Sequence, residues 1–158
     1  MKTLNLMRHA DAVAAQLGQN DYNRPLSTKG ILQAKSKQYL LQQIPVEHIY
    51  CSTAKRTLET AAILLENSSI KTHITYAEPL YNCTFNTLLN FILTLPHSIQ
   101  NVLVIGHNPS LSQVLNHFIN DTQLAYLDTS SFISIQFETL DWTMLECAPL
   151  SIPFKDFN

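Results

Sequence analysis

Arg8 and His9 stand side by side directly after the short apolar segment Leu4–Met7. A guanidinium stays charged at neutral pH and donates paired hydrogen bonds to phosphate oxygens, whereas a neutral imidazole can act as a nucleophile. In open α/β sheets, ligands bind beyond the carboxyl ends of the strands. The pair therefore predicts an anion site at a strand end, with His9 placed to attack a bound phosphoryl group.

A second histidine, His107, follows Asn101–Ile105, which is the most strand-like stretch of the chain. Neighbouring strands lie about 4.8 Å apart, so His9 and His107 would flank one small volume if their strands pair in parallel. A helix is expected to start at Asn108 and Pro109, and the free N–H groups of a helix start favour an anion. Both histidines are therefore candidates for one phosphate site, with Asn108 as a further substrate-binding candidate.

The three arginines of the chain, Arg8, Arg24 and Arg56, each fall in a segment that could belong to this site. Arg56 lies in the first turns of a predicted helix, where a cation opposes the helix dipole unless an anion is bound there. Arg24 lies in a loop, and it is assigned to the site only because the other candidate residues point to a phosphate site. Three guanidinium groups would stabilise the charge of a transferring phosphoryl group and keep a nearby imidazole neutral and nucleophilic.

The elements that must position these residues alternate between strand and helix. Strands are expected at Leu4–Met7, His48–Cys51, Ile74–Tyr76, Asn101–Ile105 and Phe132–Phe137, and helices from Ser27 or Thr28 to Ile44, Ala54–Glu66, Phe85–Leu95 and Asn108–Ile119. The segment Thr143–Cys147 is expected to form the hairpin partner of Phe132–Phe137. This order predicts an α/β fold of three layers (αβα), with a mainly parallel sheet and helices on both faces. The length of 158 residues favours a single domain over residues 1–158.

Composition excludes several other classes of protein. A net charge of −2 provides no basic field for nucleic acid or for an anionic membrane. The three cysteines form no Cys-x-x-Cys pair, which argues against a disulfide framework or a zinc site and favours a reducing compartment. The apolar residues before Arg8 are too few for a secretory signal, so a cytoplasmic protein is expected. The acidic residues are scattered, and no metal or other cofactor is expected.

With these residues in view, the chain resembles the histidine phosphatase superfamily, with its phosphoglycerate mutase-like fold, and within it the SixA-type phosphohistidine phosphatase branch. Four segments in the same order carry the resemblance: Met7–Asp11, Arg24–Gly30, Ser52–Thr60 and Val104–Pro109. Three positions depart from the family pattern. Ala10 replaces the glycine of the Arg-His-Gly signature, Thr53 replaces a proline, and Glu59 replaces a glutamine.

The resemblance implies that His9 is the nucleophile and forms a phosphohistidine intermediate, which water then hydrolyses. It also implies that Arg8, Arg56 and His107 form the phosphate pocket, with Arg24 joining them as in the SixA branch. The expected function is a metal-independent phosphatase that acts on phosphohistidine of a protein.

The residue that would protonate a leaving group is left open by the sequence. Many members of the superfamily use a carboxylate, and Glu78 is the best-placed candidate, although it reads equally well as an exposed loop residue. Asp11 is a weaker candidate, since its side chain could serve only to orient nearby backbone. An alkoxide leaving group needs a proton donor more than the nitrogen of a phosphoramidate does. A site without a clearly placed general acid is therefore compatible with phosphohistidine as substrate.

Two alternatives remain at this stage. One is a small-molecule phosphomonoesterase of the same superfamily with Glu78 as its acid, and the other is a non-catalytic phosphate-binding module. A mutase is disfavoured because the chain lacks room for the insertions that enclose a mutase substrate. The expected partner is thus a histidine-phosphorylated protein or a small phosphorylated substrate, with no nucleic acid and no membrane.

Overall fold

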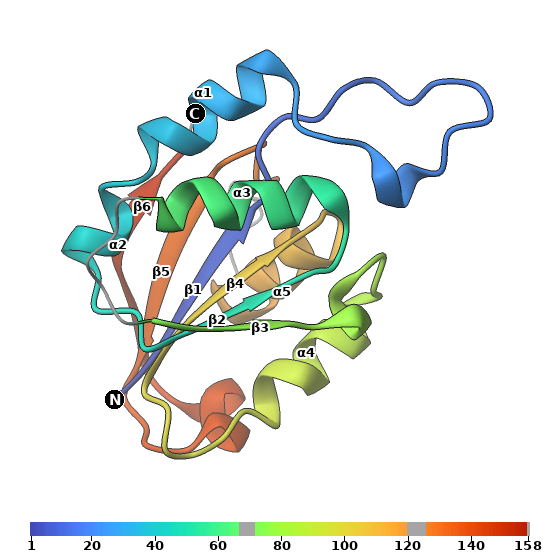
Figure 1. Ribbon diagram of the computed structural model, residues 1–158. Coiled ribbons are helices and arrows are strands. Elements are labelled where there is room, and N and C mark those ends of the chain that lie inside the picture. The colour runs from blue at the N-terminus through green and yellow to red at the C-terminus, as the bar shows by residue number, and fades with distance from the viewer. Residues whose placement is uncertain (67–71, 120–125, 158) are drawn as a thin grey trace.

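A six-stranded sheet with strand order β3-β2-β4-β1-β5-β6 forms the middle of the fold (Figure 1). The computed structural model describes residues 1–66, 72–119 and 126–157. The strands are β1 (Lys2–Arg8), β2 (His48–Cys51), β3 (His73–Tyr76), β4 (Asn101–Gly106), β5 (Phe132–Phe137) and β6 (Leu150–Asp156). Neighbours among β3, β2, β4 and β1 pair in parallel. β5 is antiparallel to both β1 and β6. The predicted α/β fold with a mainly parallel sheet is confirmed.

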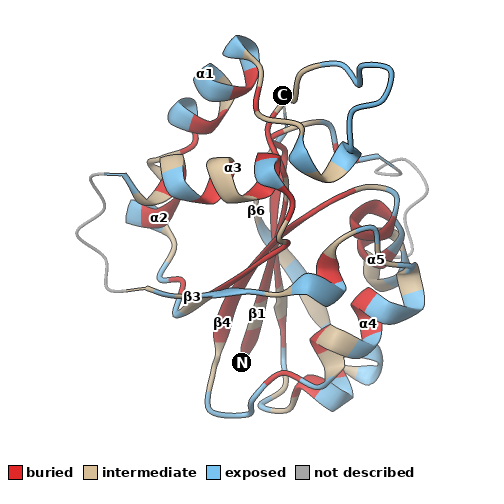
Figure 2. Cartoon of the chain, turned by 45° about the vertical axis from the view of Figure 1, so that its right-hand side comes forward, coloured by how far each residue is buried: buried red, intermediate tan, exposed pale blue. Residues whose placement is uncertain are grey.

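Helices cover both faces of this sheet (Figure 2). They are α1 (Thr28–Ser36), α2 (Leu40–Gln43), α3 (Lys55–Leu65), α4 (Phe85–Leu93) and α5 (Ser110–Ile119), with 3₁₀ turns η1 (Asp21–Asn23), η2 (Glu78–Leu80) and η4 (Trp142–Cys147). Side chains alternate along β1, so that Leu4 and Leu6 pack on the side of α4 and α5 while Met7 packs on the side of α2 and α3. Within the described residues, no helix is long and apolar enough to cross a membrane.

The parallel register brings the ends of β1, β2 and β4 to one edge of the sheet. Arg8 pairs with Gly106, and Cys51 pairs with Ile105. The backbone N–H of His9 donates to the carbonyl of Gly106, the last residue of β4, over 3.1 Å, so the ladder continues one residue beyond the end of β1. The first residues after these strands must therefore lie side by side.

The start of α1 is set by local chemistry that the sequence predicts. Ser27 is the N-cap, and its hydroxyl accepts a hydrogen bond from the N–H of Gly30 at 3.0 Å. Gly30 lies against the backbone of Asp11, and a Cβ atom there would come within 1.9 Å of the Asp11 carbonyl oxygen. This close approach fixes the chain after His9 against the first turn of α1.

The prediction of one continuous helix from Ser27 or Thr28 to Ile44 is wrong, because this segment forms two helices, α1 and α2. At the break, the buried Lys37 forms a 2.6 Å ion pair with Asp156 of β6, and the hydroxyl of Tyr39 donates to the same carboxylate. The turn between the helices is therefore tied to the edge of the sheet by long-range contacts, which helical periodicity does not reveal.

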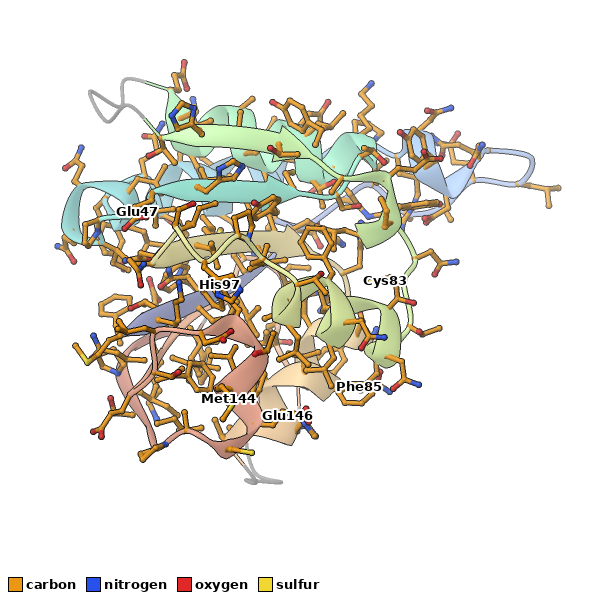
Figure 3. All side chains as sticks on the ribbon, turned by 90° about the horizontal axis from the view of Figure 1, so that it is seen from below. Glu47, Cys83, Phe85, His97, Met144 and Glu146 are labelled. Atoms are coloured by element: carbon orange, nitrogen blue, oxygen red, sulfur yellow. The ribbon has the colours of Figure 1, made fainter. Side chains whose placement is uncertain are left out.

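The predicted hairpin strand Thr143–Cys147 is also wrong, since these residues form η4 and β6 is the partner of β5. Asp141 caps η4 by accepting the N–H of Thr143 at 2.9 Å, and Trp142 and Leu145 are both buried three residues apart. Figure 3 shows Met144 and Glu146 on η4, on the same side of the sheet as Phe85 of α4.

The helix expected from Asn108 begins at Ser110 instead. The side chain of Asn108 does not cap it: its amide donates to the carbonyl of Leu127 at 2.8 Å, and its oxygen accepts from Ser112 at 2.8 Å. Asn108 thus fastens the segment after α5 to the start of that helix. The element nevertheless begins within three residues of His107, close to where the sequence places it.

Candidate active site

A pocket of about 510 Å³ opens beyond the carboxyl ends of β1 and β4. Its lining is predominantly polar and includes most of the residues singled out from the sequence. The lining residues are Arg8, His9, Asp11, Ala12, Asp21, Arg24, Arg56, Tyr81, Asn82, His107, Asn108 and Thr129. Segments that lie up to 121 positions apart in the chain therefore meet here, as the strand order requires.

The two imidazoles face each other, with ring centroids 5.1 Å apart. Nδ1 of His9 lies 2.7 Å from the carbonyl oxygen of Ala10. A carbonyl can only accept, so Nδ1 carries the proton and Nε2 keeps its lone pair. Arg56 donates to that lone pair from its Nε at 3.2 Å. The nucleophilic nitrogen of His9 therefore points toward the guanidinium-lined side of the pocket.

His107 takes the opposite tautomer. The Arg56 guanidinium donates to Nδ1 of His107 at 3.3 Å, and Nε2 lies 2.7 Å from the hydroxyl oxygen of Ser52. Because a guanidinium only donates, Nε2 carries the proton and donates it to Ser52. Ser52 is the first residue after β2 and is fully buried, so its hydroxyl fixes the orientation of the His107 ring.

Both histidines are held neutral. Burial lowers the pKa of His9 to about 4, helped by the positive charges of Arg56, Arg8 and Arg24 and opposed by the hydrogen bond to Ala10. Burial also lowers the pKa of His107 to about 3, with smaller contributions from His9 and Arg56. At neutral pH, His9 therefore keeps an unprotonated ring nitrogen for nucleophilic attack.

Arg56 connects both rings to the mouth of the pocket. Its side chain is only 7% exposed, and besides the two histidines it binds Asp21, by 2.8 Å to the backbone oxygen and 3.0 Å to the carboxylate. Its position at the start of α3 is held by Thr60, whose hydroxyl donates to the Arg56 carbonyl and accepts the N–H of Ala10. The helix thereby fixes the cation and the nucleophile's loop to each other.

The remaining predicted arginines reach the pocket from two other segments. Arg8 donates to the carbonyl of Leu127 at 3.0 Å, and its guanidinium lies 5.2 Å from the ring centroid of Tyr126. Arg24 lies 2.8 Å from the carboxylate of Asp21 and donates to the carbonyl of Val13. The structure thus brings all three arginines to one pocket.

The two carboxylate candidates occupy different places. Asp11 lines the pocket, but its carboxylate accepts a hydrogen bond from the hydroxyl of Ser27 and so braces the start of α1. Glu78 is exposed at the start of η2 and is not among the pocket's lining residues. Among the described residues, no group of three or more histidines, cysteines or acidic residues is close enough to hold a metal ion.

Sequence reasoning missed Asp21, Ser52 and Tyr81. Asp21 lies in an aperiodic loop, and its contacts with two arginines depend entirely on the folding of that loop over α3. Tyr81 reaches the same carboxylate at 3.2 Å, and its ring lies edge-on to His107 with centroids 5.8 Å apart. Ser52 had a usable signal, because it directly follows a strand that neighbours the one leading to His107.

Comparison with known proteins places this chain in a family. The family model of the histidine phosphatase superfamily (branch 1) matches residues 4–87, and the chain belongs to that superfamily. An uncharacterized protein of Mycobacterium tuberculosis (strain H37Rv) is 33% identical over 108 residues, which are 67% of this chain and 65% of that relative. The adenosylcobalamin/alpha-ribazole phosphatase of Salmonella typhimurium (strain LT2) is 37% identical over 71 residues, 44% of this chain and 35% of the relative.

Solved structures extend the likeness to the whole fold. SixA from Agrobacterium tumefaciens superposes with a TM-score of 0.85 at 22% identity, covering 99% of this chain and 98% of the other. The protein histidine phosphatase SixA in complex with tungstate gives a TM-score of 0.79 at 20% identity, covering 98% and 96% of the two chains. At these identities the likeness establishes the shared phosphoglycerate mutase-like fold.

Proposed function

We propose that this protein is a metal-independent phosphatase that hydrolyses phosphohistidine on a protein through a phosphorylated His9. The observation that carries the proposal is the unprotonated Nε2 of His9, which faces a pocket lined by three arginines and a second neutral histidine. Guanidinium groups suit the spread negative charge of a phosphoryl group in transfer, and they leave the imidazole free to attack.

The reaction proceeds in two displacements. Nε2 of His9 attacks phosphorus, the bond from phosphorus to the substrate nitrogen breaks, and the electron pair of that bond stays with the departing imidazole. Water then attacks phosphorus of the phosphoenzyme, the bond to Nε2 breaks, and inorganic phosphate leaves. Arg8, Arg56 and His107 surround the charge that develops in both steps.

The carboxylates around the pocket support a nitrogen leaving group. Glu78 lies outside the lining, and Asp21 is bound by two guanidinium groups. An imidazole that is already protonated on its other nitrogen departs as a neutral molecule and needs no acid from the protein. An alkoxide departs as a strong base and does need one, so esters are expected to react more slowly.

A small-molecule phosphomonoesterase is the second candidate. The likeness to the Salmonella typhimurium adenosylcobalamin/alpha-ribazole phosphatase favours it, because that relative carries the name of an enzyme of small phosphorylated compounds. In this alternative Glu78 would be the acid, reaching the substrate once it is bound.

Comparing kcat/KM on a histidine-phosphorylated protein and on small phosphomonoesters, with the parent chain and Glu78→Gln, separates the two functions. The proposal predicts higher kcat/KM on the phosphoprotein and little effect of Glu78→Gln on either substrate. A preference for esters that Glu78→Gln abolishes would replace it with the phosphomonoesterase. Binding of phosphate without turnover of any substrate would identify a non-catalytic phosphate-binding module.

A further inference from the structure

Asp21 is held firmly at the mouth of the pocket. Its carboxylate lies 2.8 Å from Arg24 and 3.0 Å from Arg56, and the hydroxyl of Tyr81 donates to it at 3.2 Å. Its backbone oxygen also accepts from Arg56. The loop that carries Asp21 extends beside the N-terminal end of α3 (Figure 1), so these contacts anchor the loop over the phosphate pocket.

The Asp21 carboxylate also binds Arg24, which is the cation that a carboxylate of the substrate would otherwise contact. Each of the three nitrogens of Arg24 already has an oxygen partner: Nε and one terminal nitrogen bind Asp21, and the other binds the carbonyl of Val13. Arg24 is 21% exposed, so it is reachable from solvent but engaged. Arginine and carboxylate form strong paired contacts, and here the acid comes from the protein itself.

The geometry points to Asp21 as a specificity-determining residue that disfavours phosphorylated compounds with a second anionic group a few bonds from phosphorus. This inference rests on the proposed function, because the pocket must bind a phosphoryl group. It adds to the proposed function the class of leaving group that the pocket accepts. The imidazole of a phosphohistidine carries no negative charge and meets no repulsion there.

Two electrostatic effects act in the same direction. A substrate carboxylate at the mouth would face the like charge of Asp21, and it would find each nitrogen of Arg24 already in contact with an oxygen of the protein. Partial burial would raise the pKa of the Asp21 carboxyl, but the hydrogen bonds and charges of Arg24 and Arg56 outweigh it and hold that pKa below its ordinary value. Asp21 is therefore charged at neutral pH, which the repulsion requires.

Binding of two matched phosphonates tests this role without any turnover. Propylphosphonate and 3-phosphonopropionate share a three-carbon skeleton, and only the second carries a carboxylate. We would measure both dissociation constants by calorimetry for the parent chain, for Asp21→Asn and for Glu138→Gln. Glu138 is exposed and follows β5 at the end of the sheet remote from the pocket, so its substitution removes the same charge without touching the mouth.

The parent chain should bind propylphosphonate more tightly, and Asp21→Asn should shift the ratio of the two dissociation constants toward 3-phosphonopropionate by roughly five- to tenfold. Glu138→Gln should leave the ratio within about twofold, because solvent screens a distant charge. An unchanged ratio in Asp21→Asn, an equal shift in Glu138→Gln, or no binding of either compound would overturn the inference. Phosphohistidine hydrolysis is assayed separately, so its absence alongside a shifted ratio would refute the proposed function and leave the role of Asp21 intact.

Discussion

Nε of Arg56 donates a hydrogen bond to Nε2 of His9 across 3.2 Å. This is the nitrogen that carries the lone pair, since the other ring nitrogen is bound to the carbonyl of Ala10. A phosphoryl group that enters the pocket must therefore take over a donor of Arg56 at the same time as it presents phosphorus to His9. The contact keeps the imidazole in its reactive tautomer before substrate arrives.

Arg56→Lys should reduce kcat/KM by about 100-fold or more, because a lysine keeps the charge but cannot bind a phosphate and two imidazoles from one planar group. Steady-state kinetics on the phosphorylated substrate measure the loss. Lys55→Gln is the matched control, since Lys55 is the exposed neighbour of Arg56 at the start of α3. An equal loss in both variants would show that any substitution at the start of α3 disturbs the site, and that the planar guanidinium of Arg56 has no special role.

Ser52→Ala should lower kcat/KM roughly tenfold, because it leaves the buried Nε2–H of His107 without its acceptor. His107 would then be free to turn or to change tautomer, and its Nδ1 would no longer face Arg56. NMR of the imidazole nitrogens reports the tautomer directly. If Ser52→Ala leaves the His107 nitrogen signals and the activity unchanged, Ser52 does not position this ring.

Stability should fall as the pH drops from about 6.5 to about 4, because an unfolded histidine binds its proton in this range and the buried rings do not. The pKa of His9 is lowered to about 4 in the folded chain. That shift alone corresponds to about 3 kcal/mol of unfolding free energy lost across this window.

Urea unfolding at the two ends of this pH range, for the parent chain and His9→Asn, measures the difference. The variant should lose less stability between the two pH values than the parent, whereas the exposed His73→Asn should behave like the parent. Identical acid sensitivity in all three chains would contradict the buried, neutral state assigned to His9.

Gly30→Ala should destabilise the fold by at least about 2 kcal/mol, because the new methyl group would overlap the Asp11 carbonyl oxygen. Gly106→Ala is the control: its added methyl would meet Leu111 at an ordinary 3.6 Å and should cost less than about 1 kcal/mol. Urea unfolding of both variants gives the comparison. Equal stability of the two would mean that α1 can move away from the chain after His9.

The residues that follow β1 and β4 could be predicted from the sequence because the signal is local. Each of His9 and His107 comes directly after a buried apolar strand, and parallel pairing then brings them together. Arg56 follows in the same way from the start of α3. These positions depend on strand ends and helix starts, which short sequence patterns mark well.

The errors arise where distant contacts decide the local structure. The break between α1 and α2 depends on the ion pair of Lys37 with Asp156, which lies 119 residues away. Asp21 lies in a loop without helical or strand periodicity, and its position depends on contacts with the distant residues Arg56 and Tyr81 and with Arg24. β6 is not predicted from the sequence because Pro153 argues against a strand, and proline is tolerated there because β6 is an edge strand.

Trapping the phosphoenzyme tests the central role of His9 most directly. A substrate with radioactive phosphate is mixed with the enzyme, quenched under alkaline conditions that preserve phosphohistidine, and the labelled residue is located by peptide mapping. The account predicts label on His9 that appears and decays at rates consistent with kcat, and neither label nor turnover in His9→Ala. Steady turnover by His9→Ala, or label carried by another residue, would contradict it.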